Sequence, residues 1–223
     1  MLTKLNYTVP QDILQAATEN IPLEEFKSTI NEPSGNFFYD PWNIKKEFED
    51  TVWHEILKTL PFEIGEARII VLKHGHCYQS HGDIDDRYHL NISGQYSYVI
   101  NLETETMYPQ IANGIWYEMD AGPRHSAANF GNCDRAQLVV RKLLSKNNLD
   151  FPINVKLSYA GTSEYGVRFA FDDIISPWLN RANKSLFITD FSYSHNDVRF
   201  KIEESKLLEL RNILPTDFKI EIL

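Results

Sequence analysis

The spacing of apolar residues along the chain changes twice and divides the sequence into three regions. Residues 1–62 have a largely helical pattern, and the expected helices cover residues 11–18, 23–30 and 43–60. In the last of these an apolar residue recurs at every fourth position, at Phe48, Val52, Ile56 and Leu60. Such a stripe predicts that this helix packs against another layer of the protein.

Residues 67–144 change to the pattern of short strands. Six segments are expected to be strands, most of them bounded by Gly, Pro, Asn or Asp: residues 67–74, 87–93, 96–102, 115–119, 125–130 and 135–144. Short strands at about ten-residue spacing are typical of a sandwich or jelly roll rather than of a parallel α/β sheet. The sequence therefore predicts a mainly β fold with a jelly-roll core.

Residues 147–223 follow a polar linker and predict a small α+β unit. The expected order is a strand at 153–157, a helix at 172–181 that Pro177 kinks or restarts, a hairpin of 186–191 and 198–202, a helix at 204–214 and a strand at 218–222. This βαββαβ order matches a ferredoxin-like layout. We therefore predict two domains, residues 1–146 and 147–223. Units of the second kind are often binding or dimerisation modules, so a homodimer is one expectation.

Composition narrows the class of protein. The net charge of −9 argues against a nucleic-acid partner, because phosphate binding needs clustered Lys and Arg. No stretch approaches the roughly 20 apolar residues of a membrane span, and residues 1–10 lack a signal pattern. Two cysteines, Cys77 and Cys133, are too few for a disulfide framework. We expect a cytoplasmic protein with reduced thiols and no membrane partner.

Candidate metal ligands lie in the middle region. His81-Gly82-Asp83 places an imidazole and a carboxylate two residues apart, so that an extended chain points both to one side. His125 starts a later predicted strand, after a turn. Two histidines and one carboxylate on one face of a metal leave the opposite face open for a cosubstrate and O₂, which suits Fe(II).

Three further residues carry or can carry positive charge near these ligands. Arg87 and His89 form a second pair at i and i+2, and Arg135 lies ten residues after His125. A dicarboxylate needs a buried partner for its distal carboxylate, and the planar fork of arginine provides one. The alternative is that both arginines are exposed strand charges, worth about a kcal/mol or less in surface pairs.

Taken together, these segments resemble the aspartyl/asparaginyl β-hydroxylase family of Fe(II)- and 2-oxoglutarate-dependent oxygenases. The resemblance covers roughly residues 67–144 and is carried by His81-Gly82-Asp83, Arg87-Tyr88-His89-Leu90, residues 114–120, residues 125–129 and Arg135. It implies a jelly-roll core, iron held by His81 and His125, and Arg135 bound to the distal carboxylate of 2-oxoglutarate. It also implies that Arg87 and His89 lie near the C1 carboxylate of the oxoacid.

One departure from the family concerns Asp83. The animal protein hydroxylases of the family lack a carboxylate at this position, whereas bacterial hydroxylases of free amino acids, which the core also resembles, have it. The sequence thus predicts a dioxygenase that hydroxylates an amino-acid side chain, in a peptide or in a free amino acid. Two alternatives stay open: a cupin-like site formed by His74, His76 and His81, and a non-catalytic jelly-roll protein that binds a metal or a small molecule.

Overall fold

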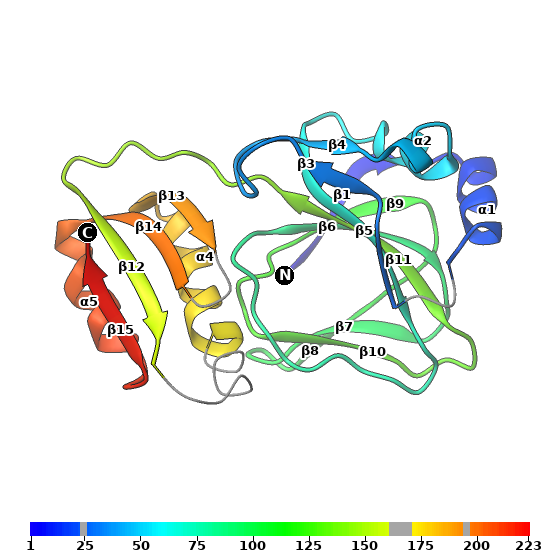
Figure 1. Ribbon diagram of the computed structural model, residues 1–223. Coiled ribbons are helices and arrows are strands. Elements are labelled where there is room, and N and C mark those ends of the chain that lie inside the picture. The colour runs from blue at the N-terminus through cyan, green and yellow to red at the C-terminus, as the bar shows by residue number, and fades with distance from the viewer. Residues whose placement is uncertain (23–25, 161–170, 194–196) are drawn as a thin grey trace.

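The protein is mainly β, with several antiparallel sheets, in the computed structural model, which describes residues 1–22, 26–160, 171–193 and 197–223. A six-stranded sheet has the order β1-β9-β6-β11-β5-β2, with the bounds Leu2–Thr8, Ile115–Met119, Arg87–Ser93, Arg135–Lys142, Ile64–Leu72 and Lys27–Thr29. A three-stranded sheet of order β10-β7-β8 faces it, with the bounds His125–Asn129, Ser97–Asn101 and Thr106–Pro109 (Figure 1). We call these two sheets the sandwich.

The connection between β5 and β6 extends the smaller sheet. Its residues run beside β10 and form two isolated antiparallel bridges, Cys77 with Ala128 and His81 with His125. The amide of Tyr78 also donates a hydrogen bond to the carbonyl of Ala127. This irregular edge segment therefore lies inside the hydrogen-bonded framework of the sandwich, which fixes where the side chain of His81 is placed.

The two faces of the six-stranded sheet have different chemistry. On the outer face, alternate apolar residues of β6 and β11, such as Leu90 and Leu138, pack in one core with residues of α1 (Gln11–Glu19) and α2 (Val52–Leu57). Figure 1 shows both helices on this side of the sheet. On the inner face the same strands present buried polar residues: Arg87, His89, Asn91, Arg135, Gln137 and Arg141. Each fully buried Leu or Ile contributes about 1.5–3 kcal/mol. The outer core can therefore stabilise the fold while the interior carries polar groups.

A separate sheet contains the C-terminal strands in the order β13-β14-β12-β15. The unit comprises β12 Pro152–Tyr159, a π-helical turn Phe171–Ile175, α4 Ser176–Lys184, β13 Ile188–Tyr193, β14 Asp197–Glu203, a 3-10 turn Glu204–Lys206, α5 Leu207–Ile213 and β15 Phe218–Ile222. Its core contains Trp178, Phe191 and Phe200, and two residues from outside the unit, Phe38 and Ile84, join that core. In Figure 1, α4 lies between this sheet and the sandwich.

The expected elements of the N-terminal region were partly wrong. The helix expected at 11–18 is confirmed as α1, and the apolar stripe of the third expected helix does pack on the outer core. That segment is broken, however, into β4 (Trp42–Ile44), a 3-10 turn (Lys46–Phe48) and α2. The helix expected at 23–30 is not found where the chain is described: residues 27–29 form the strand β2. Residues 23–25 lie outside the described residues. β4 pairs with β3 (Asn31–Pro33) instead of extending a helix.

The strand predictions were closer. All six expected strands of the middle region are present, within a few residues at their ends, while β1 and β8 were not anticipated. In the C-terminal region, Pro177 lies in the first turn of α4, so that α4 restarts after the π-helical turn as expected. The tip of the expected hairpin, residues 194–196, lies outside the described residues.

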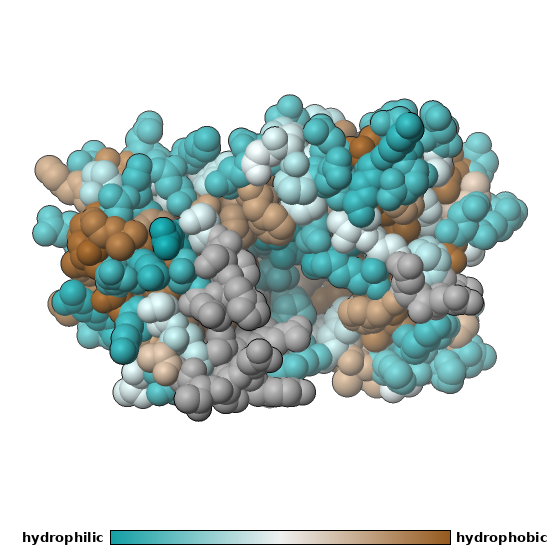
Figure 2. Space-filling view, in the orientation of Figure 1, coloured by the Kyte–Doolittle hydropathy of each residue, from teal (hydrophilic) through white to brown (hydrophobic). Residues whose placement is uncertain are grey.

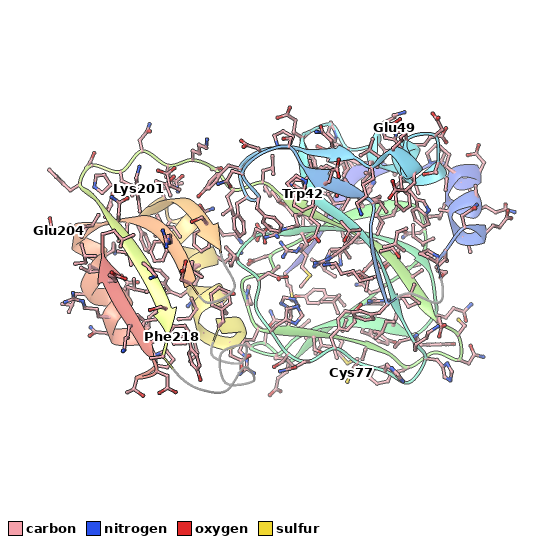
Figure 3. The ribbon with its side chains drawn as sticks, in the orientation of Figure 1. Trp42, Glu49, Cys77, Lys201, Glu204 and Phe218 are labelled. Atoms are coloured by element: carbon pink, nitrogen blue, oxygen red, sulfur yellow. The ribbon has the colours of Figure 1, made fainter. Side chains whose placement is uncertain are left out.

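Two further findings bear on the expected cellular context. None of the helices in the described ranges is both long and apolar enough to cross a membrane. Cys77 and Cys133 are both free and exposed. Figure 3 shows Cys77 at the edge of the sandwich, pointing away from its interior.

Candidate metal centre

Three side chains meet at one end of the sandwich, two from the connection between β5 and β6 and one from the first residue of β10. His81 and His125 occupy facing positions of an antiparallel bridge, and each amide donates to the carbonyl of the other, at 2.9 and 2.8 Å. The two imidazole rings are 4.4 Å apart between centroids. Asp83 approaches the same point, with its Oδ2 3.8 Å from Nε2 of His125. One ligand atom from each of the three residues lies within 4.8 Å of the others.

Both histidines are oriented by backbone carbonyls. Nδ1 of His81 lies 2.9 Å from the carbonyl of Gln79, and Nδ1 of His125 lies 2.9 Å from the carbonyl of Pro123. When each Nδ1–H donates to its carbonyl, the proton is fixed on Nδ1 and the Nε2 lone pair is free for a metal. Burial lowers the pKa of His125 to about 4, so this imidazole is neutral at pH 7, as a metal ligand must be.

Asp83 is held by a buried arginine. Nη2 of Arg87 donates to Oδ1 of Asp83 at 2.9 Å, and Nη1 of Arg87 binds the carboxylate of Asp85. Burial alone would raise the pKa of Asp83, but Arg87 and the two histidines lower it below its usual range. Asp83 is therefore ionised, with one oxygen on Arg87 and the other toward the histidines. Arg87 therefore orients the carboxylate, as hydrogen-bond partners of the ligands do in known metal sites.

Arg135 is a buried cation without a counter-ion among the residues that the structure describes. The side chain of Arg135 is fully buried, and its Nη2 donates to the hydroxyl of Tyr78 at 3.0 Å. Nε and Nη1 have no hydrogen-bond partner within the described ranges. Burial lowers the pKa of this guanidinium, whereas proximity to Tyr78 raises it. A buried charge without a partner costs several kcal/mol, so an anion at this position would recover much stability.

His89 lies between Arg135 and the metal ligands. Its two ring nitrogens are buried and have no partner among the residues that the structure describes. Burial lowers its pKa to about 3, and the positive charges of Arg135, His125 and Arg87 add to that effect. This neutral imidazole therefore offers one N–H donor and one acceptor to a ligand inside the sandwich.

The pKa of His89 predicts how the metal-free protein responds to acid. Because the folded pKa lies below the unfolded value of about 6.5, only the unfolded chain gains this proton as the pH falls toward 3. The free energy of unfolding should therefore decrease through this range. When the pH is lowered from 7 to 5, the free energy of unfolding of His89→Gln should fall by about 2 kcal/mol less than that of the wild type. Urea unfolding in a chelator measures this, and equal losses in both proteins would contradict it.

Arg141 is engaged elsewhere, although it lies on the same face of β11 as Arg135. Its Nε donates to Asp85 at 2.5 Å, and its guanidinium lies over the rings of Phe37 and Phe38, 4.3 and 4.9 Å from their centroids. Of the two arginines, only Arg135 has fully buried donor nitrogens without a hydrogen-bond partner within the ranges described.

The structure thus brings together all six residues singled out from the sequence: His81, Asp83, His125, Arg87, His89 and Arg135. It does not bring His74 and His76 to the same place, because both are exposed and His74 pairs with Asp134. Sequence reasoning missed Asp85, which no motif marks. It also missed the contacts that α4 makes with the segments around Asp83 and before His125, since the contacting residues lie far apart in the sequence: Asn180 is 94 positions from Asp86, and Lys184 is 64 positions from Asp120.

Access to the interior is visible in the space-filling view. Figure 2 shows this face hollowed near its middle, over the space between the two sheets, and mostly hydrophilic residues are seen within the hollow.

Neither the scan against protein-family models nor the search of curated proteins returned a match. Function is therefore inferred from the geometry of the site and from the sequence resemblance.

Proposed function

We propose that this protein is an Fe(II)- and 2-oxoglutarate-dependent dioxygenase that hydroxylates an amino-acid side chain, in a peptide or in a free amino acid. The observation that carries the proposal is the pairing of two features inside one sandwich. One is the cluster of His81, Asp83 and His125, and the other is the buried guanidinium of Arg135, whose Nε and Nη1 have no hydrogen-bond partner among the described residues. A metal cluster alone suits many functions, whereas a nearby buried cation adds the requirement for an anionic ligand.

The residues present fit an iron ion. The cluster offers two imidazole nitrogens and one carboxylate oxygen, a set typical of non-haem Fe(II) oxygenases with open positions. Hydrogen bonds to the carbonyls of Gln79 and Pro123 leave both Nε2 atoms available. Bound there, iron would supply the activation of O₂ and the oxidation of the substrate C–H bond.

The interior also fits 2-oxoglutarate. Arg135 offers the distal carboxylate two donors, Nε and Nη1, that have no partner in the described part of the chain, and Tyr78 adds a hydroxyl beside them. His89 and Arg87 lie on β6 toward the metal end, where the C1 carboxylate would bind. A dicarboxylate spanning these groups would neutralise Arg135 and satisfy a nitrogen of His89, two costs that the ligand-free interior carries.

The fold is consistent with this proposal. Two facing antiparallel sheets with a polar interior support a jelly-roll core, and the C-terminal strand order β13-β14-β12-β15 supports a ferredoxin-like unit. The chain's own part in catalysis is to hold the three ligands, orient Asp83 through Arg87, and fix the oxoacid along the inner face.

The proposed reaction converts 2-oxoglutarate, O₂ and a C–H bond into succinate, CO₂ and a C–OH group. The test is succinate formation in the presence of Fe(II) and ascorbate, with and without a pool of free amino acids and peptides. We expect succinate above the level of a His125→Ala control, and a mass increase of one oxygen in the acceptor. Binding of iron and oxoacid without any succinate would instead indicate a non-catalytic binding protein.

A further inference from the structure

Helix α4 of the C-terminal unit touches both loops that carry the candidate metal ligands. We call residues 81–86 and 120–125 the ligand loops. A Cβ atom on Gly82, between His81 and Asp83, would lie 2.5 Å from Cγ of Pro177 and 2.7 Å from the carbonyl oxygen of Gly122. A Cβ atom on Gly122 would lie 2.5 Å from Oδ1 of Asn180. The two glycines therefore allow α4 and the two loops to pack together without intervening side chains.

One lysine at the end of α4 binds both ligand loops at once. Nζ of Lys184 lies 2.8 Å from Oδ1 of Asp86 in the first loop and 2.6 Å from Oδ1 of Asp120 in the second. The amide of Asn180, one turn earlier on α4, donates to the same Asp86 oxygen at 3.3 Å. Lys184 is thus a polar connection between the loop that carries His81 and Asp83 and the loop that leads to His125.

Two further contacts fix the same loops to the C-terminal unit. Ile84, directly after Asp83, is buried in the hydrophobic core of that unit together with Trp178 and Leu179. Arg124, directly before His125, forms an ion pair with Asp173 at 3.3 Å, just ahead of α4. Each ligand loop is therefore held at a residue adjacent to a candidate ligand.

We propose that α4 is a positioning element of the metal centre, and that Lys184 is the residue that holds the two ligand loops at the separation the metal requires. This inference rests on the proposed function only in taking the cluster of His81, Asp83 and His125 to bind a metal. Its consequence is that the C-terminal unit contributes to metal affinity although it supplies no ligand.

The sign of one substitution separates positioning from simple electrostatics. Lys184→Met removes a positive charge near a cation site, so a purely electrostatic effect would tighten metal binding. A loss of positioning would weaken it, and supporting groups of this kind typically change metal affinity by tenfold or more. We therefore expect Lys184→Met to raise the Kd for Co(II), used as a spectroscopic substitute for Fe(II), by about tenfold.

The matched control is Lys201→Met. Lys201 forms a comparable ion pair, 2.6 Å from Asp190, with the same side-chain exposure of 41% as Lys184. It belongs to β14 of the same unit and is labelled in Figure 3, away from the sandwich. This variant reports the general cost of losing a Lys–Asp pair in the C-terminal unit. We expect its Co(II) affinity to match that of the wild type.

The measurements are anaerobic Co(II) titration, the visible absorption spectrum of the Co(II) complex, and thermal unfolding of the metal-free protein. Lys184→Arg, which keeps the charge and the reach, should restore most of the affinity and the wild-type spectrum. By itself, Asp120→Asn should weaken Co(II) binding. It should add little to the effect of Lys184→Met, because both substitutions remove the same ion pair.

Three results would overturn the inference. The first is Co(II) binding by Lys184→Met that is unchanged or tighter. The second is an equal loss in Lys201→Met, and the third is a loss that Lys184→Arg does not rescue. A wild-type protein that binds no Co(II) would instead contradict the proposed function, and the positioning role would fail with it. The two failures are thus distinguished by the wild-type titration alone.

Discussion

Replacing His125 with Ala should abolish stoichiometric binding of Fe(II) while the chain keeps its fold. His125 is one of only two imidazoles in the described cluster, so its loss leaves a single histidine and Asp83. Two ligands do not hold Fe(II) firmly, because affinity in such sites comes from several donors of fixed geometry. The side chain packs at the end of β10 and makes one hydrogen bond, to a backbone carbonyl. The fold should therefore survive its truncation.

Anaerobic titration with Fe(II) measures the effect, and His81→Ala should behave in the same way. The matched control is His76→Ala, which removes an exposed histidine of the same segment and tests the cupin-like alternative. That variant should bind iron like the wild type. Stoichiometric iron in His125→Ala, or its loss in His76→Ala, would show that the ligand set is wrong.

The sandwich strands could be predicted from the sequence because their signals are local. β6 and β9 coincide with the residues expected, since alternation and bounding turn residues mark both ends of each. The strand β1 was not expected because its residues are mostly exposed and alternate weakly, and its position depends on pairing with β9. The pairing of segments that lie far apart in the sequence cannot be predicted from the local spacing of apolar residues.

The expected long helix at 43–60 failed for a related reason. The apolar residues at every fourth position do face the outer core, where Ile56 and Leu60 are buried. The first residues of that segment instead pair with β3, where Asn43 lies opposite Glu32. Strand pairing therefore overrode the local preference for helix at residues 43 and 44.

The candidate site was predictable as far as motifs extend. His81 and Asp83 are neighbours in the sequence, and the spacing of His125 and Arg135 follows from a turn and a strand. The supporting contacts were not predictable, because they join residues that lie far apart in the sequence. Asp85 pairs with Arg141, and Lys184 pairs with Asp86, only once the chain has folded. Ordinary charged residues of this kind carry no signature in a single sequence.

Arg135→Ala should raise the Kd for 2-oxoglutarate by about a hundredfold or more. Removing one partner of a buried ion pair costs roughly 3–5 kcal/mol, and each 1.4 kcal/mol is a tenfold change in affinity. In the absence of oxoacid the substitution should not destabilise the fold much. It removes a buried charge whose only described partner is the hydroxyl of Tyr78. Ligand affinity and stability should therefore separate in this variant.

The matched control is Arg141→Ala on the same face of β11. Arg141 pairs with Asp85 and stacks on Phe37 and Phe38, so its loss should lower the unfolding temperature and change the Kd for 2-oxoglutarate far less. A second comparison uses 2-oxopentanoate, which has the same chain length but no distal carboxylate. The wild type should bind it much more weakly than 2-oxoglutarate, and Arg135→Ala should lose that discrimination. If Arg141→Ala lost as much oxoacid affinity as Arg135→Ala, or if Arg135→Ala still discriminated, the distal carboxylate would have to bind elsewhere.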